Sequence, residues 1–328
     1  MLKSILNKIK IFRTYRLLYI KYYFCKKIKN ILRMIGLNKV KGVLYALLFA
    51  GFATVLLYSC RMSEKPKPII SVTIQPQKYF AEKLVGDRFI INCVVPQGGN
   101  PEAYDPTPSH LVQVGKSVAY WRIGSLGFEL AWLDKLAQNN PDMRIFDLSK
   151  GVEPLPDTHH HSSELGRHLH ASDPHYWSSP KKVLIMVRNM YDAVLELDPK
   201  GEKYYTKNYE ELVAEISRVD SVLEERLKPV HGQMFAIYHP SLSYLASDYH
   251  LRQLSVEHNG KEASAFSLKK TVDVAKENGV RVIFIQREFD AKLAEVFAKE
   301  IGAKIVPINP LNYNWSEEII AIADALVE

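Results

Sequence analysis

Residues 203–228 read KYYTKNYEELVAEISRVDSVLEERLK, and this stretch decides the fold. Its apolar side chains recur at spacings of 4, 3, 4, 3, 4 and 4 residues, with charged residues between them: Tyr205, Tyr209, Leu212, Ile216, Val219, Leu223 and Leu227. This spacing predicts a long amphipathic helix that stops at Pro229, because proline cannot continue the hydrogen-bond ladder. At 1.5 Å per residue the helix would run ~39 Å, which is longer than one small domain needs.

Short apolar runs alternate with helical segments on both sides of the long helix. Strands are expected at 69–74, 89–95, 144–148, 233–238, 253–257, 281–286 and 304–308. Helices are expected near 79–84 and 128–136, and at 242–249, 267–278, 290–301 and 315–326. Such alternation predicts parallel sheets built from strand–helix units. The same spacing would also suit a coiled coil. The segment holds fewer than four heptads and lies between two α/β regions, so a helix that links two domains is favoured.

The predicted fold is therefore α/β: two βα-sandwich lobes with parallel sheets, joined by one long backbone helix. The N-terminal lobe is expected at 69–198, with a histidine-rich loop at 157–172, the linking helix at 199–229 and the C-terminal lobe at 230–328. A hydrophobic content of 47% and only 3 cysteines exclude a disordered chain and a disulfide-rich scaffold.

The basic charge belongs to the N-terminal segment. The chain has 43 Lys and Arg against 36 Asp and Glu, but residues 1–59 hold 12 of the bases and none of the acids. The remainder therefore carries 31 bases and 36 acids, a net charge of −5. We accordingly expect no nucleic-acid partner.

A targeting signal is expected at 34–59. Residues 43–58 form an apolar run of sixteen residues, which is short for a membrane span of roughly 20 but suits a signal peptide. The tetrapeptide that ends at Cys60 resembles a bacterial lipobox, so Cys60 is the predicted lipidation site, followed by a tether over 60–68. An uncleaved anchor helix is the alternative. Residues 1–33 are interpreted as a mispredicted extension before a start at Met34, with a genuine start at Met1 as the alternative.

Four polar residues are candidates for a binding site, because each lies after an expected strand or just before a helix. Glu102 lies in a Gly/Pro-rich loop after the strand at 89–95, His175 precedes a helix, and His239 and Asn309 directly follow strands. Strand-end positions of an open α/β fold converge on its crevice. Imidazole nitrogens with a carboxylate suit Zn²⁺, with Mn²⁺ or Fe²⁺ as alternatives. Each residue alone has an ordinary structural explanation, so the combination carries the prediction.

The chain resembles the zinc- and manganese-specific solute-binding proteins of bacterial ABC importers over nearly all of 69–328. The most specific matching segments are NPEAYDPTP (100–108), DPHYWSSP (173–180) and YHP (238–240). The resemblance implies metal between the lobes, with the second and third ligands at His175 and His239. Glu102 stands where the family usually has histidine, and Asn309 stands at the fourth position, which is often an acidic residue or is left to water. It also implies capture of metal, zinc foremost, outside the cytoplasmic membrane and delivery to an ABC permease with its ATPase.

The remaining expectations concern partners and alternatives. A His-rich loop near the cleft is common in zinc-specific members, and here it would be an auxiliary metal-gathering segment: His159, His160, His161, His168 and His170. We expect a monomer in the cell envelope that is lipid-anchored and is not an enzyme. A zinc hydrolase is the enzyme alternative, since two histidines, a glutamate and water also form a catalytic set. No motif for a general base or nucleophile accompanies it. A metal-stabilised adhesin lipoprotein is the third alternative.

Overall fold

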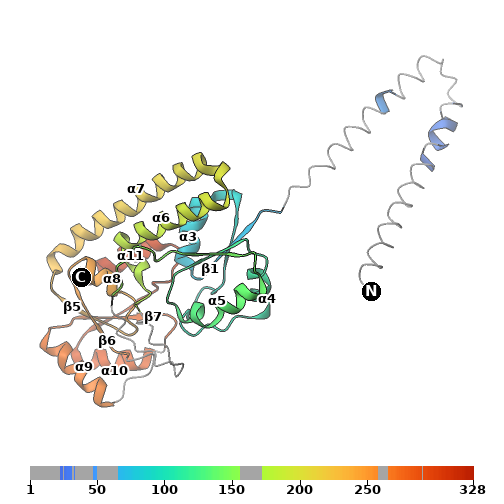
Figure 1. Ribbon diagram of the computed structural model, residues 1–328. Coiled ribbons are helices and arrows are strands. Elements are labelled where there is room, and N and C mark those ends of the chain that lie inside the picture. Colours follow the sequence, from blue (N-terminus) through green and yellow to red (C-terminus); the bar gives the residue numbers. More distant parts are fainter. Residues whose placement is uncertain are drawn as a thin grey trace. The chain divides into compact units, whose positions relative to one another are not determined.

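The computed structural model describes residues 66–155, 172–257, 265–289 and 291–328, with helical residues at 23–24, 26–31, 33 and 47–49. Met1–Pro66 and Lys67–Glu328 are separate units (Figure 1). Among the described residues, no helix combines the length and the apolar character that crossing a membrane requires. Cys60, most of 34–59 and the five histidines of the His-rich loop lie outside the described residues.

Two four-stranded parallel sheets organise the unit Lys67–Glu328. The first has the strand order β2-β1-β3-β4, and the second repeats that pattern as β6-β5-β7-β8. The strands are β1 (Ile69–Val72), β2 (Ile90–Cys93), β3 (Ala119–Arg122), β4 (Arg144–Asp147), β5 (Met234–Ile237), β6 (Arg252–Ser255), β7 (Val282–Gln286) and β8 (Lys304–Ile308). In both sheets the first strand in the chain lies between the second and the third.

Helices connect the strands and link the two sheets (Figure 1). They are α3 (Gln75–Val85), α4 (Pro108–Val114), α5 (Gly127–Asn139), α6 (Pro180–Leu197), α7 (Glu202–Leu227), α8 (Ser243–Asp248), α9 (Ala265–Glu277), α10 (Ala291–Ile301) and α11 (Trp315–Val327). The predicted α/β architecture of two parallel sheets joined by one long helix is confirmed. The lobe boundaries at 198/199 and 229/230 stay a prediction.

The long helix α7 buries the face that the sequence predicted. Six of its seven periodic residues are buried, and the seventh, Tyr209, is half-buried and stacks on Tyr191 with ring centroids 4.7 Å apart. The helix packs against α6, α11 and α3. Its neighbours therefore come from both sides of it in the chain.

One hydrophobic core joins both sheets and α7. It contains Leu84 of the first lobe, Ile216 of α7 and Phe235 of the second lobe. Two buried indoles add hydrogen bonds across the lobes: Trp177 Nε1 donates to the carbonyl of Pro310 at 3.0 Å, and Trp315 Nε1 donates to the carbonyl of Trp177 at 2.7 Å. A wide hinge opening would expose this core and break these bonds, so the arrangement favours small adjustments of loops.

Candidate metal centre

His175 is held by the carboxylate two residues before it. Its backbone N–H donates to Asp173 Oδ1 at 2.8 Å, and its ring Nδ1 lies 2.9 Å from the same oxygen. Burial opposes ionisation of Asp173, but the charge and the hydrogen bonds of His175 lower the pKa of this carboxyl. An ionised Asp173 accepts the proton of Nδ1, so the lone pair of a neutral imidazole is left on Nε2, which is the arrangement that metal-binding histidines use.

His239 follows β5 and is held in the same manner. Its Nδ1 lies 3.0 Å from Glu257 Oε2, and both side chains are buried. Its backbone N–H donates to Gln286 Oε1 at 3.3 Å, while the Gln286 amide donates to the His239 carbonyl and, at 2.8 Å, to Ser241 Oγ. Phe289 stacks on the imidazole with ring centroids 5.0 Å apart. The His239 ring is thus held at its Nδ1 edge by the Glu257 carboxylate and on its face by the Phe289 ring.

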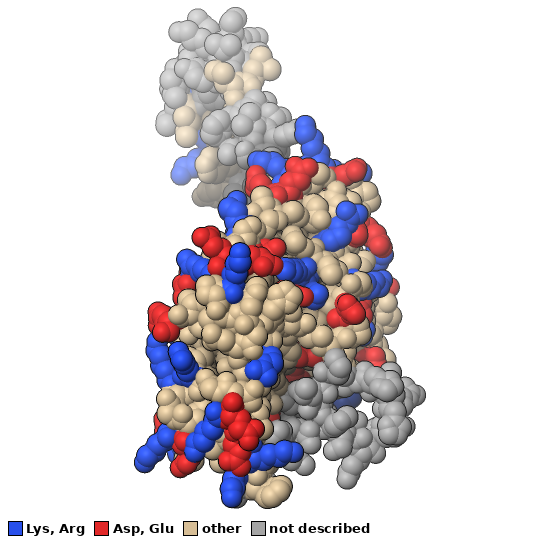
Figure 2. All heavy atoms as spheres, turned by 90° about the vertical axis from the view of Figure 1, so that its left-hand side faces the viewer, with Lys and Arg blue, Asp and Glu red and all other residues tan. Residues whose placement is uncertain are grey.

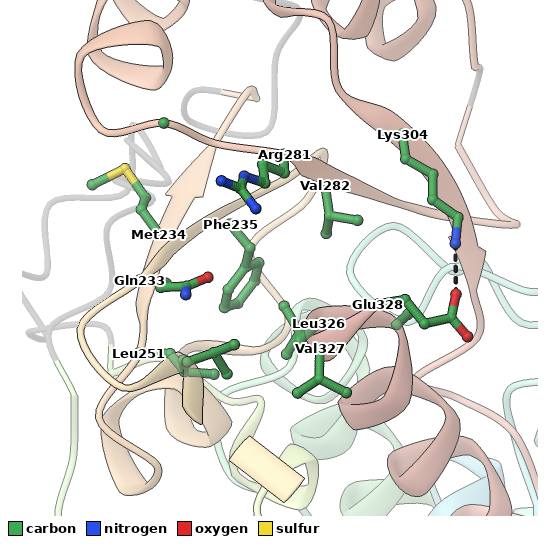
Figure 3. Close-up of a pocket in the computed structure, with 13 residues that line it drawn as sticks. Gln233, Met234, Phe235, Leu251, Arg281, Val282, Lys304, Leu326, Val327 and Glu328 are labelled. Atoms are coloured by element: carbon green, nitrogen blue, oxygen red, sulfur yellow. Dashed lines mark hydrogen bonds and ion pairs between the residues drawn. The ribbon is translucent and has the colours of Figure 1, made fainter. Parts of the chain in front are cut away.

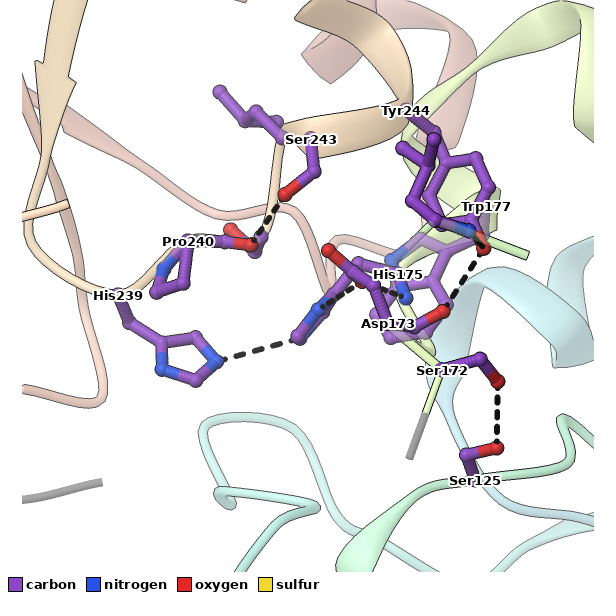
Figure 4. Close-up of polar contacts among 12 residues, drawn as sticks. Ser125, Ser172, Asp173, His175, Trp177, His239, Pro240, Ser243 and Tyr244 are labelled. Atoms are coloured by element: carbon purple, nitrogen blue, oxygen red, sulfur yellow. Dashed lines mark hydrogen bonds and ion pairs between the residues drawn. The ribbon is translucent and has the colours of Figure 1, made fainter. Parts of the chain in front are cut away.

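The two histidines, one from each lobe, point at one another (Figure 4). Their Nε2 atoms are 3.3 Å apart. A tetrahedral ion with bonds of about 2.0–2.1 Å separates its ligand atoms by ~3.3–3.4 Å. The pair therefore already has the spacing of two adjacent ligands of one zinc ion.

Glu102 approaches from the loop before α4. Its Oε2 accepts the backbone N–H of Gly127 at 3.0 Å, while Oε1 lies 3.9 Å from His175 Nε2 and is buried with no hydrogen-bond partner among the described residues. A Cβ atom on Gly127 would collide with the Glu102 carbonyl, so glycine is what lets this loop dock on the start of α5. An unpaired buried carboxylate oxygen is costly, and a cation would satisfy it.

The three side chains are near one another but do not form a finished ligand shell. Among the described residues, no group of three or more His, Cys, Asp or Glu is arranged to hold a metal ion as it stands. The 3.9 Å between Glu102 and His175 exceeds the ~3.3 Å edge of a zinc tetrahedron by roughly 0.6 Å. A rotation of one glutamate side chain supplies that shift, whereas the two imidazoles need none.

The cavity between these side chains has a volume of about 10 Å³. That is room for one water molecule or one ion, and far below the roughly 300 Å³ or more of pockets for organic ligands. Its lining comprises Asn100, Pro101, Glu102, His175, Trp177, His239, Ser241, Glu288, Phe289, Pro310 and Leu311. The geometry suits a single ion.

The lining differs from the expected set at one position. Asn309 is half-buried and does not line the cavity, whose wall there consists of Pro310 and Leu311; its backbone N–H donates to Glu318 Oε1 at 2.7 Å. Asn309 as a ligand stays a prediction. Sequence reasoning missed Glu288, although it too follows a strand end, that of β7. Burial raises the pKa of the Glu288 carboxyl, against the opposing influence of His239 and His175.

A larger hollow of about 240 Å³ lies at the opposite, amino ends of the C-terminal strands (Figure 3). Its lining mixes aliphatic side chains with Gln233, Arg281, Lys304 and Glu328 and contains no histidine or cysteine. Its one carboxylate, Glu328, forms an ion pair with Lys304 Nζ at 2.7 Å, so the hollow offers no cluster of zinc ligands. On the face in Figure 2 basic and acidic side chains are mixed, without one dominant sign.

Known proteins match this chain over most of its length. The family model described as "Zinc-uptake complex component A periplasmic" matches residues 70–326. The high-affinity zinc uptake system protein ZnuA of Bacillus subtilis is 28% identical over 264 residues, which are 78% of this chain and 82% of that protein. The iron-binding protein YfeA of Yersinia pestis is 26% identical over 230 residues, 68% of this chain and 71% of that one. A crystal structure of ZnuA superposes with a TM-score of 0.73 at 35% identity, covering 80% of this chain and 98% of that chain.

Two parallel α/β lobes, one connecting helix and a single-ion cavity lined by histidine and glutamate define a solute-binding protein for a metal ion. The match over 70–326 makes the assignment specific: the chain belongs to the zinc-uptake complex component A family of periplasmic proteins. This is a family of solute-binding proteins and not of enzymes. The resemblance inferred from the sequence is confirmed.

Proposed function

We propose that the protein captures Zn²⁺ between its lobes with His175, His239 and Glu102, and that water or Asn309 completes the coordination. The observation that carries this proposal is the 3.3 Å spacing of the two Nε2 atoms, each on an imidazole whose other nitrogen faces a buried carboxylate. Borderline-soft imidazole ligands rank zinc ahead of Mn²⁺ and Fe²⁺. The similarity to both a zinc-uptake protein and an iron-binding protein supports this order of candidates.

The captured ion is then delivered to an ABC permease that works with its ATPase. In this proposal the chain is a monomer, held in the cell envelope by a lipid on Cys60, with residues 60–68 as a tether. The His-rich loop at 157–172 gathers zinc weakly and passes it to the cleft. Labelling with a radioactive fatty acid tests the anchor: wild-type protein should be labelled, and label on Cys60→Ser would contradict it.

In this proposal the protein carries out no chemistry on its ligand. A cavity of about 10 Å³ supports a single ion over the organic substrate of a zinc hydrolase. Metal binding and release are therefore the proposed activity.

Metal competition tests the cargo. Metal-free protein is titrated with Zn²⁺, Mn²⁺ or Fe²⁺ against a chromophoric chelator, with the loop 157–172 present and deleted. We expect one tight zinc equivalent that survives the deletion, and additional weaker zinc binding that depends on the loop. If the protein binds manganese or iron more tightly than zinc, that metal is the cargo instead. If it binds none of the three ions tightly, the capture function is rejected.

A further inference from the structure

Glu288 is a second carboxylate at the cavity, and the structure holds its loop firmly in place. It lies two residues beyond Gln286, whose side chain is hydrogen-bonded to the backbone N–H and carbonyl of His239. It directly precedes Phe289, whose ring stacks on the same imidazole. Since both neighbours are fixed to His239, Glu288 cannot move far from the cavity that it lines.

The sheet order explains why this loop reaches the site. The strand β7 that precedes Glu288 is hydrogen-bonded to β5, whose end carries His239. The strand β8 that precedes Asn309 lies one position further out, at the edge of the sheet. Carboxyl ends of adjacent parallel strands lie side by side, so the β7 loop meets His239 first.

Each lobe then contributes one imidazole and one carboxylate. The N-terminal lobe supplies His175 and Glu102, and the C-terminal lobe supplies His239 and Glu288. With neutral imidazoles this set carries a charge of −2 when both glutamates are ionised, which one divalent cation neutralises.

We propose that Glu288 is the fourth direct ligand of the captured ion and broadens its selectivity towards harder divalent metals; this inference rests on the proposed function. Carboxylate oxygen suits Mn²⁺ and Fe²⁺ better than it suits zinc, so a second carboxylate raises affinity most for the harder ions. Glu288 therefore supplies a negative charge that the neutral amide of Asn309 lacks.

The test compares four variants of the full chain with the wild type by chelator competition. Glu288→Gln should lower Mn²⁺ affinity roughly 100-fold and Zn²⁺ affinity roughly 10-fold, as expected for loss of a charge-assisted ligand. Glu295→Gln, an exposed carboxylate on α10 of the same lobe, is the matched control and should change neither. Asn309→Ala tests the other candidate for the fourth position and should weaken metal binding less than Glu288→Gln does, and Glu288→Asp should retain part of the manganese affinity.

Two further readouts separate ligation from folding. X-ray absorption of the zinc-loaded protein should show an altered first coordination shell in Glu288→Gln and an unchanged one in Glu295→Gln. The metal-free variant should melt like wild type, while its metal-induced rise in Tm should be smaller.

Three results would overturn the inference: unchanged affinities in Glu288→Gln, an unchanged zinc coordination shell in that variant, or a loss of affinity in Asn309→Ala instead. The variant His175→Ala separates a failure of the role of Glu288 from a failure of the capture site itself. If His175→Ala abolishes tight zinc binding and Glu288→Gln does not weaken it, only the role of Glu288 fails. If His175→Ala leaves zinc affinity unchanged, the proposed capture site itself fails.

Discussion

Replacing Glu257 by glutamine should weaken zinc binding without touching a metal ligand. Glu257 Oε2 lies 3.0 Å from His239 Nδ1, and the two residues are only 4% and 8% exposed. The carboxylate accepts the Nδ1 proton and thereby directs the Nε2 lone pair towards the cavity. An amide of the same shape keeps a hydrogen bond but loses the charge.

The magnitude follows from that single lost charge. A hydrogen bond to a charged partner contributes about 1.5–3 kcal/mol and a neutral one about 0.5–1.5, so the difference is about 1–1.5 kcal/mol, or roughly tenfold in affinity. Loss of a partner behind a ligand typically lowers metal affinity by about 10–100-fold. We therefore expect a zinc Kd about 10–100 times higher in Glu257→Gln.

The assay is competition with a chromophoric chelator at pH 7.5, with Glu300→Gln on the exposed face of α10 as the control. The control should bind zinc like the wild type. An affinity of Glu257→Gln within twofold of wild type would refute the orienting role. A loss as complete as that of His239→Ala would show that Glu257 does more than orient the ring.

Three other predictions concern stability and the docking of Glu102. Burial raises the pKa of Glu129 to about 7, so its contribution to stability is present below pH ~4.5 and is lost as the pH rises to ~7. In denaturant melts, the unfolding free energy of Glu129→Gln should rise relative to that of wild type by up to about 3 kcal/mol over that window. Parallel pH profiles of the two proteins would contradict this. Ile216→Ala, in the buried face of α7, should lower the unfolding free energy by about 2–5 kcal/mol, whereas exposed Glu210→Ala should shift it by less than about 0.5. Gly127→Ala should displace Glu102 and weaken zinc binding at least about tenfold, with Gly115→Ala as a neutral control.

The long helix and most strand–helix units could be predicted because their signals are local. The 3.6-residue period of α7 and the apolar runs of the C-terminal lobe need no knowledge of distant contacts. The strand β3 was missed: it is four residues long, reads Ala-Tyr-Trp-Arg and shows no polar alternation because it is buried beside β1. The helices α4 and α6 were likewise not delimited, and α3 begins at Gln75 rather than near Tyr79, since proline is tolerated in a first turn.

The site could be predicted in part, because strand ends meet at one edge of a parallel sheet. That rule applies to Glu102 and His239, whereas His175 was placed by its position before a helix and by the family resemblance. It could not rank Glu288 against Asn309, since both follow strands and only the sheet order, β6-β5-β7-β8, makes one of them adjacent to His239. The roles of Asp173 and Glu257 behind the imidazoles depend on side-chain orientation, which no spacing in the sequence encodes.

The central claim is that one ion is held between two imidazoles from different lobes. The most direct measurement is the zinc stoichiometry and affinity of the metal-free double variant His175→Ala/His239→Ala beside wild type, both without the loop 157–172. The account predicts one tight zinc equivalent in the wild type and none in the double variant, with both proteins folded by circular dichroism. Tight zinc binding that persists in the double variant would contradict it and place the metal elsewhere.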